Sequence, residues 1–272
     1  IEDMADHMVL AKWAMRNIAA LNCVEITFAP KLAVGHAGTG LHIHMAAFKK
    51  GKNIFLDKGE LSDTARKVIG GLVKLAPSLT AFGNTIPISY LRLVPHQEAP
   101  TNVCWGDSNR SVLIRVPLGW RNIGNLSAIA NNSKETAGNS GEIRQTVELR
   151  SPDGSANSHL LLAGIAVAAT YGLTSRESLQ LAKESYVGVN IFREEHKNLQ
   201  DKLGHLPSSC YESAAKLREQ ASFYLEGGIF NARVLEGIEG QLEAHNDREM
   251  NENLKMDKEK AEQYIKKFFY CG

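Results

Sequence analysis

The sequence predicts an α+β fold in which strands and loops come first and helices come last. Short segments with alternating apolar and polar residues lie before about residue 150, and charged helical patterns fill the chain from about residue 174. No internal repeat and no Gly/Ser-rich linker separates two domains. We therefore expect one domain over residues 1–272, with a sheet-bearing core at 1–173 and a helical region at 174–272.

The composition excludes several classes of protein. Apolar residues make up 43% and charged residues 22%, an ordinary globular balance, and a net charge of +1 favours neither nucleic acid nor an anionic membrane as partner. The longest apolar run, residues 160–169, is far shorter than the roughly 20 residues that span a bilayer. The four cysteines are scattered, with no CxxC pair, which is typical of the reducing cytoplasm.

Periodicity predicts the elements in order. We expect helices over 4–21, from Ser62 onward, over 156–171, after Ser209, and near 230–247 and 256–269. Strands are expected over 24–28, 42–48, 111–116 and 144–150. Residues 78–110 hold three of the eight prolines and predict mainly ordered loop, and 119–143 predicts a long polar loop. Two adjacent glycines, Gly70 and Gly71, are costly inside a helix and predict close packing against a neighbour.

A glycine-rich segment, Gly38-Thr39-Gly40, precedes a strand that carries two histidines. It is not a Walker-type phosphate loop, because no Lys-Ser or Lys-Thr pair follows. Side chains two residues apart share a face of a strand, so His42 and His44 should point the same way. This pattern fits either metal ligation, which needs further ligands from elsewhere, or a half-exposed strand with histidines in solvent.

The expected strand at 144–150 shows the same alternation. Arg144, Thr146, Glu148 and Arg150 share one face, opposite Val147 and Leu149. A carboxylate flanked by arginines on one face is either a surface ladder of ion pairs or a metal-binding Glu beside anion-binding Arg.

Further charged residues lie between these two strands. They are Arg92, Glu98, Arg110 and Arg115. Together with the histidines and Glu148 they form an inventory suited to a polyphosphate, divalent cations and a carboxylate substrate, since Mg²⁺ and Mn²⁺ favour carboxylates, phosphate oxygens and some imidazoles.

Four ordered segments carry a resemblance to a known family. They read GTGLHIH, ARKVIGGLVKLAPSLTAFGNTIPISYLRLVPHQEAP, WGDSNRSVLIRVP and VELRSPDGSANSHLLLAGI. Their order and spacing over about residues 5–175 resemble the C-terminal catalytic domain of glutamine synthetase. The resemblance implies a curved, mostly antiparallel sheet flanked by helices, with a helical C-terminal part.

The resemblance also implies roles for single residues. His42 and Glu148 match metal ligands, and His44 matches a histidine on the nucleotide side. Gly38, Arg92 and Arg150 match groups that meet the amino-acid substrate. Glu98 matches a flap glutamate with a catalytic role, and the remaining two, Arg110 and Arg115, match arginines that contact the transferred phosphate and ATP.

The implied activity is ATP-dependent ligation of ammonia to glutamate through a γ-glutamyl phosphate, with ATP and Mg²⁺ or Mn²⁺. The implied partners are these small substrates and further copies of the chain in a homo-oligomeric ring. The family also has an N-terminal β-grasp domain and upstream metal-ligand strands that these 272 residues lack. We therefore expect a catalytic-domain fragment that is inactive alone.

Departures from the family pattern keep other functions open. Ala37 replaces an Asn before the glycine, His96 replaces a Gly, and Thr146 stands where many members carry Arg, with Arg144 nearby on the same strand face. These changes allow a γ-glutamyl ligase for a polyamine or another larger amine, or a non-catalytic family member. A metal-dependent amidohydrolase remains a remote alternative, because the other histidines do not follow strands.

Overall fold

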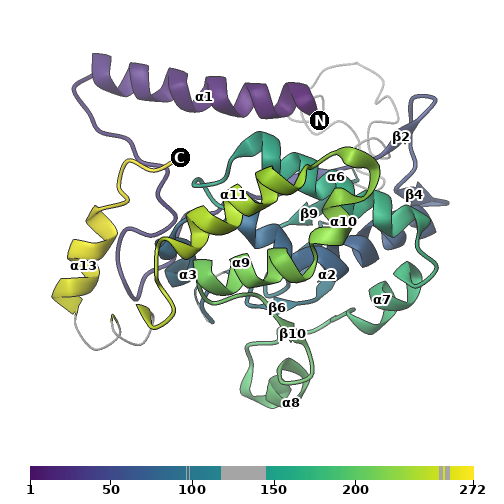
Figure 1. The fold of residues 1–272 in the computed structure, drawn as a ribbon. Helices are drawn as coiled ribbons and strands as arrows, with labels where there is room; N and C mark the ends of the chain where they lie inside the picture. The colour runs from purple at the N-terminus through teal and green to yellow at the C-terminus, as the bar shows by residue number, and fades with distance from the viewer. Residues whose placement is uncertain (96, 98, 118–144, 251–253, 255–257) are drawn as a thin grey trace, which may run out of the picture.

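The structure, a computed structural model, describes residues 1–95, 97, 99–117, 145–250, 254 and 258–272 (Figure 1). The expected polar loop at 119–143 therefore lies outside the described residues, as do His96, Glu98 and Arg144. Both secondary-structure types are present, and most of the described sheet pairings are antiparallel, which confirms the α+β class.

Helices dominate the described chain. They are α1 (Glu2–Leu21), α2 (Asp63–Gly83), α3 (Pro87–Arg92), α6 (Ser158–Thr174), α7 (Ser178–Glu184), α8 (Lys197–Gln200), α9 (Cys210–Glu219), α10 (Ala221–Leu225), α11 (Ala232–Glu243) and α13 (Lys258–Lys266), with 3₁₀ turns at Glu194–His196 and Glu226–Gly228. The strands are short: β1 (Ile43–Met45), β2 (Phe48–Lys49), β3 (Lys52–Asn53), β4 (Leu56–Asp57), β5 (Glu60–Leu61), β6 (Asn102–Val103), β7 (Trp105–Asp107), β8 (Ile114–Val116), β9 (Val147–Leu149) and β10 (Gly204–His205).

The main sheet of the described residues has the strand order β1-β9-β8-β7. β9 pairs antiparallel with both β1 and β8, and β7 joins β8 in parallel. The remaining strands form antiparallel pairs, β2 with β3, β4 with β5 and β6 with β10. Because β9 lies inside the sheet, its side chains have neighbours from both β1 and β8.

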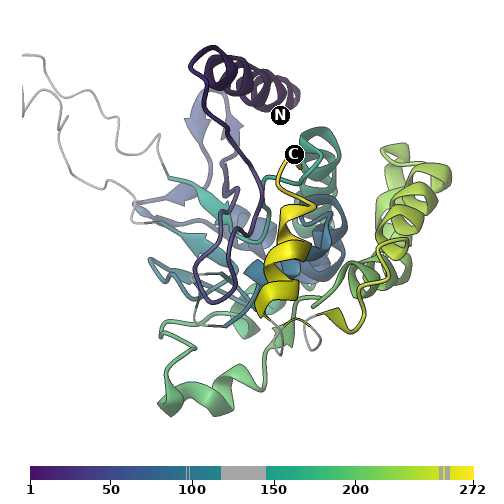
Figure 2. The same ribbon diagram turned by 90° about the vertical axis from the view of Figure 1, so that its left-hand side faces the viewer.

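Four of the helices, α2, α6, α9 and α11, form layers on one side of the main sheet (Figure 2). Figure 2 shows strands at the left, α2 and α6 in the middle, and α9 and α11 at the right. The side of α2 that faces the core is buried: Ala65, Val68, Leu72 and Leu75 are each at most 3% exposed. α6 is apolar along most of its length, and Leu161, Ile165 and Ala168 are among its buried residues.

The two glycines of α2 confirm the expectation of close packing. A Cβ at Gly70 would lie 2.0 Å from the carbonyl oxygen of Ser178 in α7. A Cβ at Gly71 would lie 2.0 Å from the carbonyl oxygen of Ala168 in α6. The same contact also involves Gly172 of α6, whose added Cβ would lie 3.1 Å from Gly71 N. Glycine is needed here because the backbones of α2 and α6 approach closely.

Side-chain caps define several helix starts. Ser62 Oγ accepts from Ala65 N at 3.1 Å, and Ser209 Oγ accepts from Glu212 N at 3.0 Å, as their spacing predicts. The Glu212 carboxylate accepts from the backbone N–H of Ser208 at 2.7 Å. In a standard capping box the donor would be the N–H of the capping residue itself, Ser209.

The prediction of a strand at 24–28 is wrong, because this segment has no strand partner among the described residues. Its polar side chains instead bond to the C-terminal segment. Thr27 Oγ1 donates to Phe269 O, and Glu25 accepts from Tyr270 Oη at 2.8 Å. Alternation of side chains alone does not supply a neighbouring strand.

The prediction of mainly loop at 78–110 is also wrong. α2 continues through Pro77 to Gly83, and α3, β6 and β7 follow. A proline inside a helix costs about 3 kcal/mol or more. Here the residues beyond it, Leu79 and Phe82, are at most 2% exposed, and their burial offsets that cost.

Within the described residues, no single helix is long and apolar enough to cross a membrane. α6 and α7 meet the length and composition criteria only as a pair, bent by 105°.

Replacing Gly71 by Ala is expected to lower the free energy of unfolding by about 1 to 3 kcal/mol, because the added methyl group would overlap the α6 backbone. Urea unfolding measures the change. The matched control is Gly237→Ala in α11, where no atom lies within 4 Å of the added Cβ and stability should rise by about 0.5 to 1 kcal/mol. Equal effects of the two changes would contradict the close contact of α2 with α6.

Candidate active site

Strand pairing brings three of the predicted site residues into one row across the main sheet. His44 on β1 lies opposite Glu148 on β9, and Glu148 lies opposite Arg115 on β8. Directly opposite side chains on neighbouring strands have Cβ atoms about 5 Å apart. The sheet therefore holds the carboxylate between an imidazole and a guanidinium.

Glu148 is the centre of this cluster and is 0% exposed. Its Oε2 accepts from Arg115 Nε at 2.5 Å. Its Oε1 lies 2.9 Å from His42 Nδ1, 3.8 Å from Arg150 Nε and 3.9 Å from His44 Nε2. The prediction that His42 and His44 point the same way is thus confirmed, as is the shared face of Glu148 and Arg150.

The environment of Glu148 keeps it ionised. Burial alone would raise the pKa of its carboxyl, but hydrogen bonds from His42 and Arg115 and the charges of Arg115 and His44 lower it to about 2. A buried carboxylate with such partners is a fixed negative charge at neutral pH.

Exposure differs between the floor and the rim of the cluster. The side chains of Glu148 and Arg150 are 0% and 4% exposed, whereas those of Arg115, His42 and His44 are 23%, 35% and 47% exposed. A ligand arriving from solvent would meet the two imidazoles and Arg115 first.

Thr146 orients His44 and was not among the predicted site residues. Its Oγ1 lies 3.0 Å from His44 Nδ1, a hydrogen bond that directs the other ring nitrogen toward Glu148. Period-two alternation along β9 already placed Thr146 on this face, so a local signal for it existed.

The two predicted substrate-binding arginines, Arg92 and Arg150, donate hydrogen bonds to backbone carbonyl oxygens. Arg92, 2% exposed, donates to the carbonyl oxygens of Ser151 at 2.7 Å, Pro152 at 3.2 Å and Arg150 at 3.0 Å. Arg150 donates to the carbonyl oxygens of Arg110 and Val112, the latter at 3.1 Å. Their predicted contacts with a substrate carboxylate remain predictions.

The glycine segment packs against these same groups. A Cβ at Gly38 would lie 2.2 Å from Pro30 O and 2.9 Å from Arg92 Cγ. A Cβ at Gly40 would lie 2.3 Å from Arg92 Nη2 and 2.9 Å from His42 Nε2. Internal packing therefore requires glycine at both positions, whether or not Gly38 also meets a substrate.

The last two predicted residues are not joined to the cluster by side chains that the structure describes. Arg110 is exposed and contributes its carbonyl oxygen to Arg150. Glu98 lies outside the described residues, so its flap role remains a prediction.

A buried lysine beside the site was not predicted from the sequence. Lys31 is 1% exposed, and its Nζ donates to His36 O at 2.5 Å and to Gln97 Oε1. The one local signal was a single lysine in the otherwise apolar run Phe28-Ala29-Pro30-Lys31-Leu32-Ala33-Val34.

The donor set fits part of a divalent-metal site. Glu148 Oε1 is a buried oxygen, and two imidazole nitrogens face it, His42 Nδ1 at 2.9 Å and His44 Nε2 at 3.9 Å. No group of three or more His, Cys, Asp or Glu in the described part of the chain forms a closed metal site. His42 and Glu148 could therefore hold a metal only together with ligands from elsewhere.

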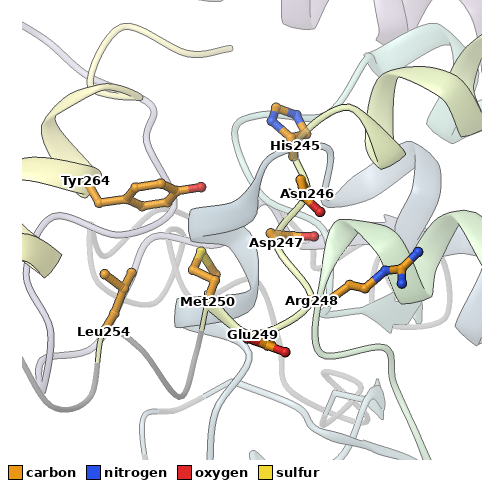
Figure 3. A pocket seen from close by; sticks show the side chains of 8 residues that line it. All are labelled: His245, Asn246, Asp247, Arg248, Glu249, Met250, Leu254 and Tyr264. Atoms are coloured by element: carbon orange, nitrogen blue, oxygen red, sulfur yellow. The ribbon is translucent and has the colours of Figure 1, made fainter.

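Two cavities of the described structure differ in their relation to this charged cluster. One of about 230 Å³ is mainly apolar and borders the cluster, because His42 and His44 line it together with Met4, Met8 and Leu161. Another of about 600 Å³ is lined by residues 245–250, Leu254 and Tyr264 (Figure 3). Asp247 in its wall is already bonded to the backbone N–H groups of Cys210 and Tyr211, at 2.8 and 3.1 Å.

Replacing Glu148 by Gln should remove a stabilising contribution that depends on pH. The pKa is depressed from 4.5 to about 2, so the ionised carboxylate contributes fully above about pH 4.5, and this contribution is lost as pH falls through about 2. The difference in unfolding free energy between wild type and E148Q should therefore shrink below about pH 4.5. Urea unfolding at stepped pH measures it, and a difference that stays constant down to the lowest accessible pH would contradict the depressed pKa.

Comparison with known proteins gives the family from sequence, and solved structures share the fold. The family model described as "Glutamine synthetase, catalytic domain" matches residues 2–239. A glutamine synthetase from Thermococcus kodakarensis is 31% identical over 269 residues, which cover 98% of this chain and 55% of that protein. One from Streptomyces coelicolor is 32% identical over 237 residues, covering 85% of this chain and 45% of that protein.

Solved structures share the fold. A Plasmodium falciparum glutamine synthetase superposes with a TM-score of 0.71 at 24% identity, covering 90% of this chain and 51% of that one. A GmaS/ADP complex gives 0.64 at 25% identity, covering 89% and 50%. The chain thus spans about half the length of the relatives that it matches. With the family model covering most of its length, the chain belongs to the glutamine synthetase family, whose catalytic domain it carries.

Proposed function

We propose that this chain provides the catalytic domain of an ATP-dependent carbon–nitrogen ligase that joins ammonia to glutamate through a γ-glutamyl phosphate. The row of His44, Glu148 and Arg115 across three strands carries the proposal, because it presents a fixed carboxylate, imidazoles and cations on one accessible face. Membership of the family supplies the reaction class.

The chemistry explains why such a face is useful. A carboxylate is a poor electrophile, and phosphorylation by ATP converts its oxygen into a good leaving group. Cations that neutralise the phosphate oxygens stabilise this in-line transfer. Arg115 on the open rim and the exposed Arg110 are the residues that we assign to the phosphate side, with His44 toward the nucleotide.

The amino-acid side is assigned to Gly38, Arg92 and Arg150. Ammonia then displaces phosphate from the acyl phosphate. The intermediate needs protection from water, and we assign that task to the segment that contains Glu98.

A divalent metal, Mg²⁺ or Mn²⁺, would neutralise phosphate oxygens when bound. His42 and Glu148 are the described residues that would hold it, and the remaining ligands would come from outside them. We also propose that activity requires more than these 272 residues.

Ala37 supports a second candidate, a ligase of the same class that accepts a larger amine. Its methyl group stands where the family has an Asn, which removes a polar group beside the glycine segment. Glutamate would still be activated by ATP, and the difference would lie in the amine.

The test is product analysis with ATP, Mg²⁺ and glutamate, comparing ammonium with putrescine and ethanolamine. Both the 272-residue chain and the complete gene product are assayed. We expect glutamine and ADP from the complete product with ammonium, and no turnover by the chain alone. Turnover only with the larger amines would select the second candidate, and no ADP formation with any amine would indicate a non-catalytic member of the family.

Replacing Arg115 by Gln is expected to lower ATP-dependent turnover by about 10²-fold or more, because a cation on the phosphate side is lost. The matched control is Arg66→Gln, an exposed arginine that pairs with Asp63 on α2 at 3.3 Å. That control should change turnover less than twofold. Steady-state kinetics measure both, and equal losses would remove Arg115 from its proposed role.

We further propose that the protein acts as a homo-oligomer. The exposed face of α1 supports this, since Val9, Leu10, Trp13, Ile18 and Leu21 are each at least 51% exposed. Apolar side chains gathered on one surface helix are typical of an interaction surface. Trp13→Glu should weaken self-association, measured by sedimentation of the complete product, and an unchanged oligomer would place the contact elsewhere.

A further inference from the structure

Lys31 is a buried cation that the proposed reaction does not use. It lies in the loop between α1 and β1 and is 1% exposed. Its Nζ donates to the carbonyl oxygen of His36 at 2.5 Å and to Oε1 of Gln97. One bond therefore closes the loop that leads to Gly38, and the other joins that loop to the segment after α3.

Neighbouring contacts hold the same loop from its other end. Thr39 N donates to Pro30 O at 2.9 Å, and the backbone of Gly38 lies against Pro30 and Arg92. The position of the Gly38 backbone therefore depends on a short closed stretch, residues 30–39, with the ammonium of Lys31 inside it. Gln97 is the bond partner through which this stretch reaches the segment that follows Arg92.

The charge at this place is costly. Burial and the neighbouring Arg92 guanidinium lower the pKa of the Lys31 ammonium to about 8. The oxygen partners of Lys31 and Arg92 that the structure describes are all uncharged carbonyl or amide groups. Burying two cations together destabilises a fold unless their hydrogen bonds fix something that the protein needs.

We propose that Lys31 is a positioning residue that fixes the loop at 36–40 against Gln97, and thereby sets the affinity for the amino-acid substrate. The second half of this inference rests on the proposed function, in which the Gly38 backbone meets that substrate. The first half concerns the loop alone. The nucleotide side, built on β1, β8 and β9, should not depend on Lys31.

The test compares Lys31→Met with Lys12→Met. Both changes remove a buried ammonium and keep an unbranched side chain that is one heavy atom shorter. Lys12 is 8% exposed, and its Nζ donates to Gly154 O at 2.8 Å, a bond that joins α1 to another loop. Both variants should lose stability, so loss of stability alone does not separate a positioning role from a structural one.

Amide exchange separates the two roles without any assay of activity. In Lys31→Met the Thr39 N–H should exchange about tenfold faster relative to the main-sheet amides, which corresponds to losing one buried hydrogen bond. In Lys12→Met its relative rate should stay within twofold of wild type. Equal acceleration in both variants, or none in Lys31→Met, would overturn the positioning of the loop.

Gln97→Met keeps the proposal testable if Lys31→Met fails to fold, because Gln97 is only half-buried. This change removes the acceptor and leaves the ammonium. Its Thr39 amide should exchange several-fold faster, and the double variant should exchange no faster than Lys31→Met where that variant folds. Independent, multiplying effects would show that Lys31 does not act through Gln97.

Kinetics on the complete product test the second half. With Lys31→Met, or with Gln97→Met if the former does not fold, KM for glutamate should rise about tenfold, while KM for ATP and kcat change less than twofold. Similar fold-changes in KM for glutamate, KM for ATP and kcat would overturn the positioning role. If wild type forms no product with any amine, the proposed function fails, and the exchange measurements still decide whether Lys31 fixes the loop.

Discussion

The ionised carboxylate of Glu148 is the group on which the arrangement of the site depends. A buried charge without partners destabilises a fold by several kcal/mol, so the chain around Glu148 must supply cations and donors. Arg115 comes from β8, His42 and His44 come from β1 or its approach, and Arg150 comes from the end of β9. One electrostatic requirement thus fixes the relative positions of three strands on the face where chemistry is proposed.

Support for this cluster extends outward through arginines that bind backbone carbonyls. Arg150 holds the turn before β8, and Arg92 holds the chain directly after β9. Gly38 and Gly40 then pack closely on Arg92, and Gly40 also on His42, because neither glycine has a side chain. The hydrogen bonds of the arginines and the packing of the glycines together place the Gly38 backbone, the imidazoles and Arg115 at defined positions around the Glu148 carboxylate.

Much of this was predictable where the determining pattern is local. Period-two alternation placed His42 with His44 on one strand face and Glu148 with Arg150 on another, and the spacing of apolar residues located α1, α2 and α6. The adjacent glycines of α2 indicated a close helix contact. The failures involve long-range partners: residues 24–28 alternate but have no strand neighbour in the described chain, Pro77 is tolerated because the residues after it are buried, and the carbonyls that Arg92 binds are about 60 residues away. Lys31 was missed for the same reason.

The charges of the described cluster indicate which part of the reaction it serves. One carboxylate, Glu148, faces two guanidinium groups, those of Arg115 and Arg150, so the cluster carries an excess of positive charge even with neutral imidazoles. Such a surface attracts phosphate and carboxylate groups, whereas a pair of divalent cations would need more carboxylates than the described part of this face contains. Thr146 on the same face is neutral and adds no charge, and it orients His44 by a hydrogen bond. The described chain therefore supplies mainly the anion-binding half of the proposed site, and its dependence on ligands from elsewhere results from this charge balance.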